Sequence, residues 1–201
     1  DINDDEIQAI EDLSDQVLAT KNLAKLEPQI KAQIQKAQPN VQKLLKAKDI
    51  EYNDSVYLHN YAILTSGYAE YLLEQHCTTL SQPFQELTEQ AYFALKKRDP
   101  NDTIAINNLG LFYAQMSVYY RKNIDPTPRL NYLLKAEQLF ETLMNLQPDN
   151  EEYEKNYYAV LSDKLMLLQK YHRDENEQKR LINILKKPLF HYLSDPNQAF
   201  D

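Results

Sequence analysis

Apolar side chains recur every three or four residues along most of this chain, which is the spacing of one face of an α-helix. Two such stripes occupy matching places: Phe84, Leu87, Ala91, Tyr92 and Leu95, then Tyr132, Ala136, Leu139, Phe140 and Leu143. A proline follows each stripe, at Pro100 and Pro148, and proline cannot continue a helical hydrogen-bond ladder. The pattern predicts two amphipathic helices that end near these prolines.

The two stripes belong to a longer internal repeat. Residues 53–100 and 101–148 are two copies of one sequence, related by a shift of 48 residues without a gap. A fixed period of this length is typical of stacked repeat architectures. Each copy is expected to contain two helices, of which the first covers Val56–Gln75 in one copy and Ile104–Lys122 in the other. Matched positions include Asn60 with Asn108, Tyr71 with Tyr119, and Leu95 with Leu143.

The repeat continues more weakly on both sides. A third copy begins at Asp149, and Asn156 stands where Asn60 and Asn108 stand. The first 52 residues match poorly, as expected of an end repeat that faces water on one side. We therefore predict one helical-repeat domain over 1–201, with degenerate N-terminal capping helices in 1–52, repeats at 53–100 and 101–148, and a third repeat with a C-terminal cap in 149–201.

Polar boxes and prolines predict where the helices begin and end. Asn53-Asp54-Ser55 and Asn101-Asp102-Thr103 carry side chains that accept hydrogen bonds from the first turn of a helix. Breaks between helices are expected at residues 78–83 and 123–128, and a polar turn between helices at residues 172–176. Pro28 and Pro39 are expected to punctuate the N-terminal helices, leaving a last short helix at Val41, Leu44 and Leu45, and Pro188 to bend or end the last helix of the chain.

The composition agrees with an all-α fold. Gly67 and Gly110 are the two glycines of the 201-residue chain, whereas turn-rich β folds need many residues at positive φ. Leu, Gln, Lys, Glu and Ala, which favour helices, dominate instead. The fold class predicted is all-α.

Charge and apolar content exclude several partners. The net charge of −8 argues against nucleic acid, whose phosphates are neutralised by Lys and Arg. No apolar run reaches the roughly 18 residues needed to cross a bilayer, so no membrane insertion is expected. One cysteine, Cys77, excludes an internal disulfide. The compartment is left open between cytoplasm and export, with a lean to export because the chain starts at Asp1 without Met.

The second copy resembles a tetratricopeptide repeat. Ile106, Leu109, Gly110 and Tyr113 have the spacing of that family's first-helix motif, and Ala136, Phe140, Leu143 and Pro148 have the spacing of its second-helix motif and closing proline. Ile106 replaces the usual aromatic residue and Leu143 the usual small one. The copy is also about 14 residues longer than the 34-residue unit, and these residues are expected to lengthen both helices, or else to form a long loop between them. The resemblance implies a right-handed α-solenoid, or superhelix, of about four antiparallel helical hairpins.

The resemblance also implies a binding groove lined by the first helices. The residues that it places there, called the predicted groove face below, are His59, Asn60, Ile63 and Ser66, then Asn107, Asn108, Leu111 and Gln115, then Lys155, Asn156, Ala159 and Asp163. Asn60, Asn108 and Asn156 form a ladder at one position. An amide both donates and accepts hydrogen bonds, as an extended peptide backbone requires. The alternative is that these asparagines brace neighbouring helices or face water.

Two other features allow more than one interpretation. Most of the fifteen tyrosines are expected to pack in or near the core, and a few to anchor a partner. Residues 1–16 carry seven acids and no base, while lysines and arginines exceed acids in 164–187. This asymmetry is expected to reflect solvated helix faces, with weak head-to-tail self-association as the alternative.

No catalytic or metal-binding pattern is found in the sequence. His59, His76, His172 and His191 are scattered, without the spacing that holds a metal. We therefore expect no enzyme activity, no cofactor and no metal. The function predicted is a protein-interaction module, adaptor or assembly factor that binds a protein or extended peptide. The alternatives are a structural subunit that associates through its ends, and a dedicated chaperone or immunity-type protein that masks one partner.

Overall fold

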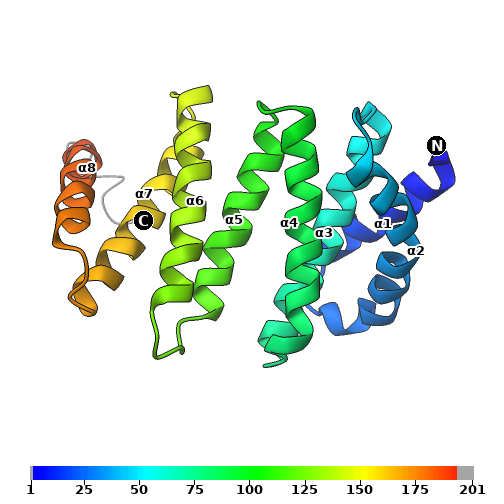
Figure 1. Ribbon diagram of the computed structural model, residues 1–201, viewed down its shortest axis with the longest axis horizontal. Coiled ribbons are helices and arrows are strands. Elements are labelled where there is room, and N and C mark those ends of the chain that lie inside the picture. The colour runs from blue at the N-terminus through cyan, green and yellow to red at the C-terminus, as the bar shows by residue number, and fades with distance from the viewer. Residues whose placement is uncertain (1, 194–201) are drawn as a thin grey trace. The chain divides into compact units, whose positions relative to one another are not determined.

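The computed structural model describes the backbone of residues 2–193 and the side chains of residues 2–186. This part of the chain is all helical, as the sequence predicts, and contains no strand. Helices that follow one another pack as antiparallel pairs (Figure 1). The elements are α1 (Asp4–Ala19), the 3-10 helix η1 (Leu23–Leu26), α2 (Glu27–Lys46), α3 (Tyr52–Glu74), α4 (Thr78–Arg98), α5 (Thr103–Tyr119), α6 (Thr127–Leu146), α7 (Glu151–Lys170) and α8 (Glu175–Leu193).

The chain forms two compact units. The N-terminal unit comprises residues 1–106 and the C-terminal unit comprises residues 107–201, so that the division falls inside α5. Each unit has its own buried core, and the two are described separately below. The helices are long: α3 spans 23 residues and α4 spans 21, with residues 75–77 between them. In the first copy the extra length therefore lies in the helices and not in a long loop, whereas residues 120–126 separate α5 from α6 in the second copy.

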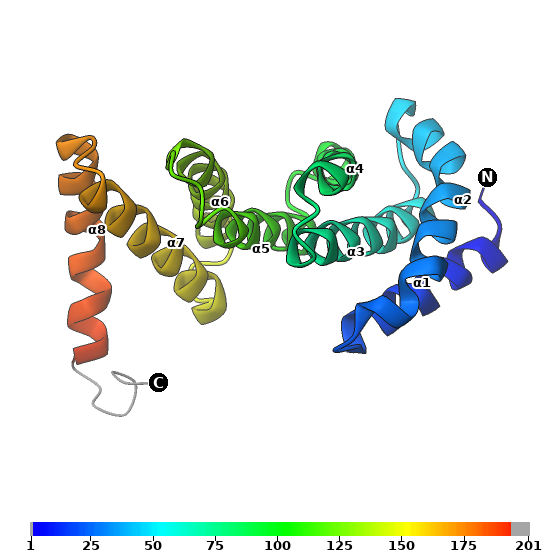
Figure 2. The same cartoon turned by 90° about the horizontal axis from the view of Figure 1, so that it is seen from below.

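In the N-terminal unit, α3 is the central helix. It pairs with α4, and both α1 and α2 pack on it while touching one another at few points (Figure 2). Tyr57, Tyr61 and Leu64 of α3 are completely or almost completely buried, as are Ile10 of α1 and Ile30 of α2. The core of this unit is thus built around one helix that three others cover.

The C-terminal unit packs α6 against α7 and α7 against α8. Its core includes Met116 of α5, Phe140 of α6, Leu161 of α7 and Leu181 of α8, each completely buried. Phe140 lies on the apolar stripe that the sequence predicts between Tyr132 and Leu143.

Both glycines lie inside helices at points of close approach. A Cβ atom added to Gly67 of α3 would lie 2.9 Å from Cγ1 of Val17 on α1, and one added to Gly110 of α5 would lie 2.9 Å from the ring of Phe140 on α6. Neither glycine has a positive φ. Their function is therefore steric: they leave room for a neighbouring helix rather than for a turn.

Prolines interrupt the helices less than the sequence predicts. Pro39 lies inside α2 and Pro83 inside α4, so the breaker at 78–83 and the separate short helix after Pro39 are wrong. The apolar stripe of α2 continues across Pro39 from Ile34 to Val41, both buried. Burial of that continuous stripe offsets the cost of about 3 kcal/mol for an interior proline. The backbone of α8 likewise continues past Pro188 to Leu193.

Of the two polar boxes predicted to begin a helix, the one at residues 101–103 does so and the one at residues 53–55 does not. Asp102 accepts a hydrogen bond from Ala105 N at 3.0 Å ahead of α5, and Asn150 caps α7 by accepting from Tyr153 N at 3.1 Å. The box at residues 53–55 does not cap a helix, because α3 already begins at Tyr52. Its buried member, Ser55, instead donates to Tyr52 O at 2.6 Å within the first turn.

Candidate functional site

In the N-terminal unit the predicted groove face lies on α3, and α1 contacts it. Asn60 is only 9% exposed. Its Oδ1 accepts a 2.6 Å hydrogen bond from Ser14 Oγ of α1, and its Nδ2 donates to Val56 O at 3.1 Å. The amide of Asn60 is therefore engaged on both sides by this chain, and it joins α1 to α3.

The other three members of the face in this unit are half-buried. His59 Nε2 lies 3.1 Å from Oδ2 of Asp102, the same carboxylate that caps α5. Ser66 donates to Ile63 O at 3.2 Å within α3. These contacts hold the start of α5 against α3 and leave few free polar atoms on this part of the face.

In the C-terminal unit the corresponding face is more open. Leu111 on α5 is 41% exposed, and Lys155, Ala159 and Asp163 on α7 are all exposed. Met166, three residues after Asp163, is 64% exposed and lies on the same side of α7 at helical spacing. Met166 is not a member of the predicted groove face, although its spacing of three residues from Asp163 indicates the same side of a helix. The remaining members, Asn107, Asn108, Gln115 and Asn156, are half-buried.

Two of these asparagines contain a buried polar atom without a partner. Oδ1 of Asn107 and Nδ2 of Asn156 are shielded from solvent and make no hydrogen bond. Among the described residues, the other side-chain atoms in this condition are Tyr61 Oη and Arg129 Nε. A buried polar group without a partner costs about 1–3 kcal/mol, so such atoms are uncommon and invite a search for a missing partner.

A charged cluster joins α6, α7 and α8. Lys164 donates to Glu137 at 2.9 Å and to Glu177 at 3.1 Å, and Arg180 donates to Glu137 at 2.6 Å. Glu137 and Lys164 are buried. Breaking one such contact would leave a buried charge uncompensated, which is strongly destabilising. The cluster thus fixes three helices of the C-terminal unit relative to one another.

The cluster also shifts the pKa of one of its carboxyls. The hydrogen bond from Arg180, followed by that from Lys164, holds the pKa of Glu177 at about 2, against the opposing effect of burial. Lys164 and Arg180 belong to the basic segment that the sequence analysis considered for self-association. Since both are paired within the unit, they are poorly suited to hold the end of another chain.

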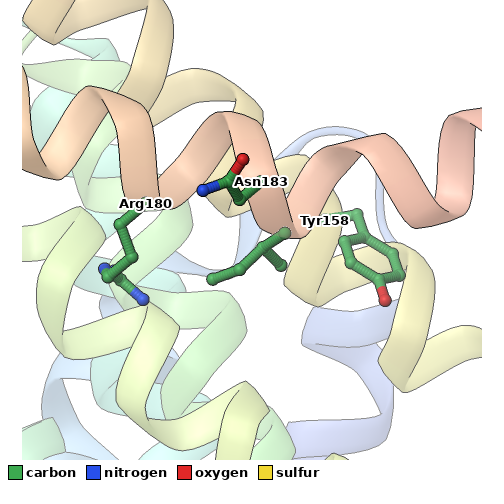
Figure 3. A pocket seen from close by; sticks show the side chains of 4 residues that line it. Tyr158, Arg180 and Asn183 are labelled. Atoms are coloured by element: carbon green, nitrogen blue, oxygen red, sulfur yellow. The ribbon is translucent and has the colours of Figure 1, made fainter.

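A hollow of about 410 Å³ lies beside this cluster, between α7 and α8. Figure 3 shows Tyr158 on one side of it and Arg180 and Asn183 on the other, and Ile184 completes the described lining. Nε and Nη2 of Arg180 are already bonded to carboxylates. The hollow was not predicted, because residues 158 and 180–184 are brought together only by the packing of α7 on α8.

The described residues contain no group of three His, Cys, Asp or Glu side chains placed to hold a metal ion. No helix in this part of the chain is long and apolar enough to cross a membrane. One carboxyl is unusual: burial, with a smaller effect from Glu74, raises the pKa of Glu70 on α3 to about 7.

Fold and site together define a class: an all-helical protein whose helices pack as sequential pairs. Comparisons with models of protein families, with curated proteins and with solved structures find no match to this chain. Its function must therefore be argued from its own geometry.

Proposed function

We propose that this protein is a non-enzymatic interaction module, an adaptor or assembly factor that binds a protein or an extended peptide. In this proposal the helix pairs stack as a tetratricopeptide-like, right-handed solenoid. The sequential antiparallel packing of the helices supports the idea. So does the close approach of Gly110 to Phe140, because both residues belong to the motif on which the resemblance rests.

The observation that carries the proposal is the pair of unsatisfied amide atoms at Asn107 and Asn156. One is an acceptor and the other a donor, and both belong to the predicted groove face of the C-terminal unit. An extended polypeptide presents alternating N–H and C=O groups, which satisfy an amide of either kind. A partner backbone that displaces the side chains covering these atoms would therefore remove an energetic penalty that the free protein carries.

Exposed apolar side chains on the same helices add to this argument. Leu111 on α5 and Met166 on α7 are large and well exposed. Methionine adapts its shape to different partners, and a few buried apolar anchors supply most of the energy of a typical interface. We accordingly assign the contact to the C-terminal unit rather than to Asn60, whose amide is occupied by Ser14.

Site-specific cross-linking tests the proposal. Partners are first captured on the full chain, and the purified partner is then mixed with chains that carry a photoreactive amino acid at Leu111 or Lys155. We expect cross-links from both positions to the same partner segment. The control carries the reagent at Leu80, which is 62% exposed, more than Leu111 at 41%, but lies on α4. Equal cross-linking from Leu80, or none from Leu111 and Lys155, would refute the assignment. In that case the alternatives are a structural subunit that associates through its ends and a protein that masks its partner with a different surface.

A further inference from the structure

The outer face of α1 is acidic. Its buried residues, among them Ile10, Leu13 and Val17, pack toward α3. At 100° per residue, the opposite side of the helix carries carboxylates, and α1 contains no basic residue. The exposed acids are Asp4, Asp5, Asp12 and Asp15.

The outer face of α2 is basic. Its buried stripe runs from Ile30 to Leu44. The single acid of α2, Glu27, accepts hydrogen bonds from Tyr68 at 3.1 Å and from Tyr71 at 3.3 Å, and so belongs to the contact with α3. The exposed charged residues of α2 are Lys31, Lys36, Lys43 and Lys46.

Both α1 and α2 pack on α3 and lie on the same side of it (Figures 1 and 2), so the acidic face and the basic face both turn away from α3. None of the four acids or four lysines forms an ion pair within the part of the chain that the structure describes. The charged side chains Lys164 and Arg180 of the C-terminal unit, in contrast, are bonded to carboxylates.

We propose that this surface binds a second copy of the same chain, with α1 of each copy lying on α2 of the other. Four acids and four lysines that form no ion pair among the described residues give this surface charges of both signs, which can pair with those of a second copy under a two-fold rotation, the symmetry of an isologous dimer. Asp12 accepts one hydrogen bond within the chain, from Gln8 Nε2 at 2.8 Å. A nucleic acid or an anionic membrane would meet the lysines favourably but would be repelled by the adjoining acids. A partner that pairs with both the acidic and the basic face must itself carry basic and acidic side chains, as this surface does.

The physical character of the contact follows from its composition. Exposed ion pairs contribute little each and are screened by salt, so the dimer is expected to be weak and to dissociate as ionic strength rises. Leu18, at the end of α1 and 69% exposed, supplies apolar area at the edge of the acidic face. This proposal is independent of the function assigned to the C-terminal unit.

Charge reversal on the full chain gives a sharp test. One variant combines Asp12→Lys with Asp15→Lys, and the other combines Lys36→Glu with Lys43→Glu. Sedimentation velocity at about 20 mM and about 0.5 M salt measures association. We expect the natural chain to dimerise at low salt, with an association constant at least about tenfold smaller at high salt. Each variant alone should be monomeric, since like charges then oppose one another.

The decisive result is the mixture of the two variants. Its α1–α2 contacts would again pair opposite charges on both sides, so the equimolar mixture should form a heterodimer at low salt. Because all four positions are exposed, the variants should unfold at the temperature of the natural chain. A chain with Glu86→Lys and Glu141→Lys controls for net charge and should dimerise normally. A natural chain that stays monomeric at low salt overturns the proposal, as does a dimer that survives in each single variant or a mixture that fails to associate.

Discussion

Ser14 on α1 donates a 2.6 Å hydrogen bond to Oδ1 of Asn60 on α3, in a buried contact between residues that are 46 positions apart in sequence. Asn60 belongs to the asparagine ladder that the sequence analysis assigned to a binding groove. In this unit the amide connects two helices of the same chain instead.

Replacing Ser14 by Ala should lower the free energy of unfolding by about 1–3 kcal/mol, because Oδ1 of Asn60 would remain buried without a donor. Urea unfolding measures the change. Ser66→Ala is the matched control, since Ser66 donates only to a carbonyl of its own helix, and it should change stability little. Equal effects from the two substitutions would contradict the proposed importance of the inter-helix bond.

Tyr61 offers the opposite case. Its side chain is completely buried and its hydroxyl has no partner, and burial raises the pKa of that hydroxyl. Tyr61→Phe removes an unsatisfied polar group at nearly constant side-chain volume. We therefore expect the free energy of unfolding to rise by about 1 kcal/mol. Tyr68→Phe, which breaks the bond to Glu27, should instead destabilise. A loss of stability in Tyr61→Phe would mean that the hydroxyl has a partner after all.

Glu70 makes stability depend on pH near neutrality. Its pKa in the folded protein is about 7, above the ordinary 4.5, so the folded state retains a proton that the unfolded state has lost. Stability therefore falls as pH rises from 4.5 to 7 and stays low above that range. Glu70→Gln should stabilise the protein by about 1–3 kcal/mol near pH 8 and by little near pH 4. Thermal unfolding at the two pH values checks this expectation, with Glu86→Gln as the exposed control.

Gly110→Ala tests the close approach of α5 and α6. Alanine is favoured over glycine inside a helix by about 1 kcal/mol, but its Cβ would lie 2.9 Å from the ring of Phe140. We expect the steric cost to win, with a net loss of about 1–3 kcal/mol. In a chain that already carries Phe140→Leu, Gly110→Ala should lower the free energy of unfolding by less than it does in the natural chain. Purely additive effects of the two substitutions would argue against a direct contact.

Asn156→Ala addresses binding rather than folding. Nδ2 of Asn156 has no partner in the free chain, so the substitution should leave the unfolding temperature unchanged or slightly raised. Affinity for a captured partner, measured by calorimetry, should fall about tenfold, which corresponds to about 1.4 kcal/mol. A drop in stability without a change in affinity would show that the amide is structural.

The candidate site was only partly visible in the sequence. The 48-residue shift aligned Asn60 with Asn156 because both stand at one place in a repeated helix. It does not reveal that Ser14 meets the first amide while Nδ2 of the second has no partner. Likewise, Glu137, Lys164 and Arg180 lie in three different helices, and nothing in their spacing predicts that they meet.

The sequence by itself determined the helical class and the buried faces, because helix formation depends on residues three and four positions apart. Only the tertiary structure decided that Pro39 and Pro83 are tolerated within helices and that Gly67 and Gly110 face a neighbouring helix. It also decided which amides are satisfied and which charges are paired. Those outcomes depend on burial and on partners that are distant in the chain, and local spacing carries no information about them.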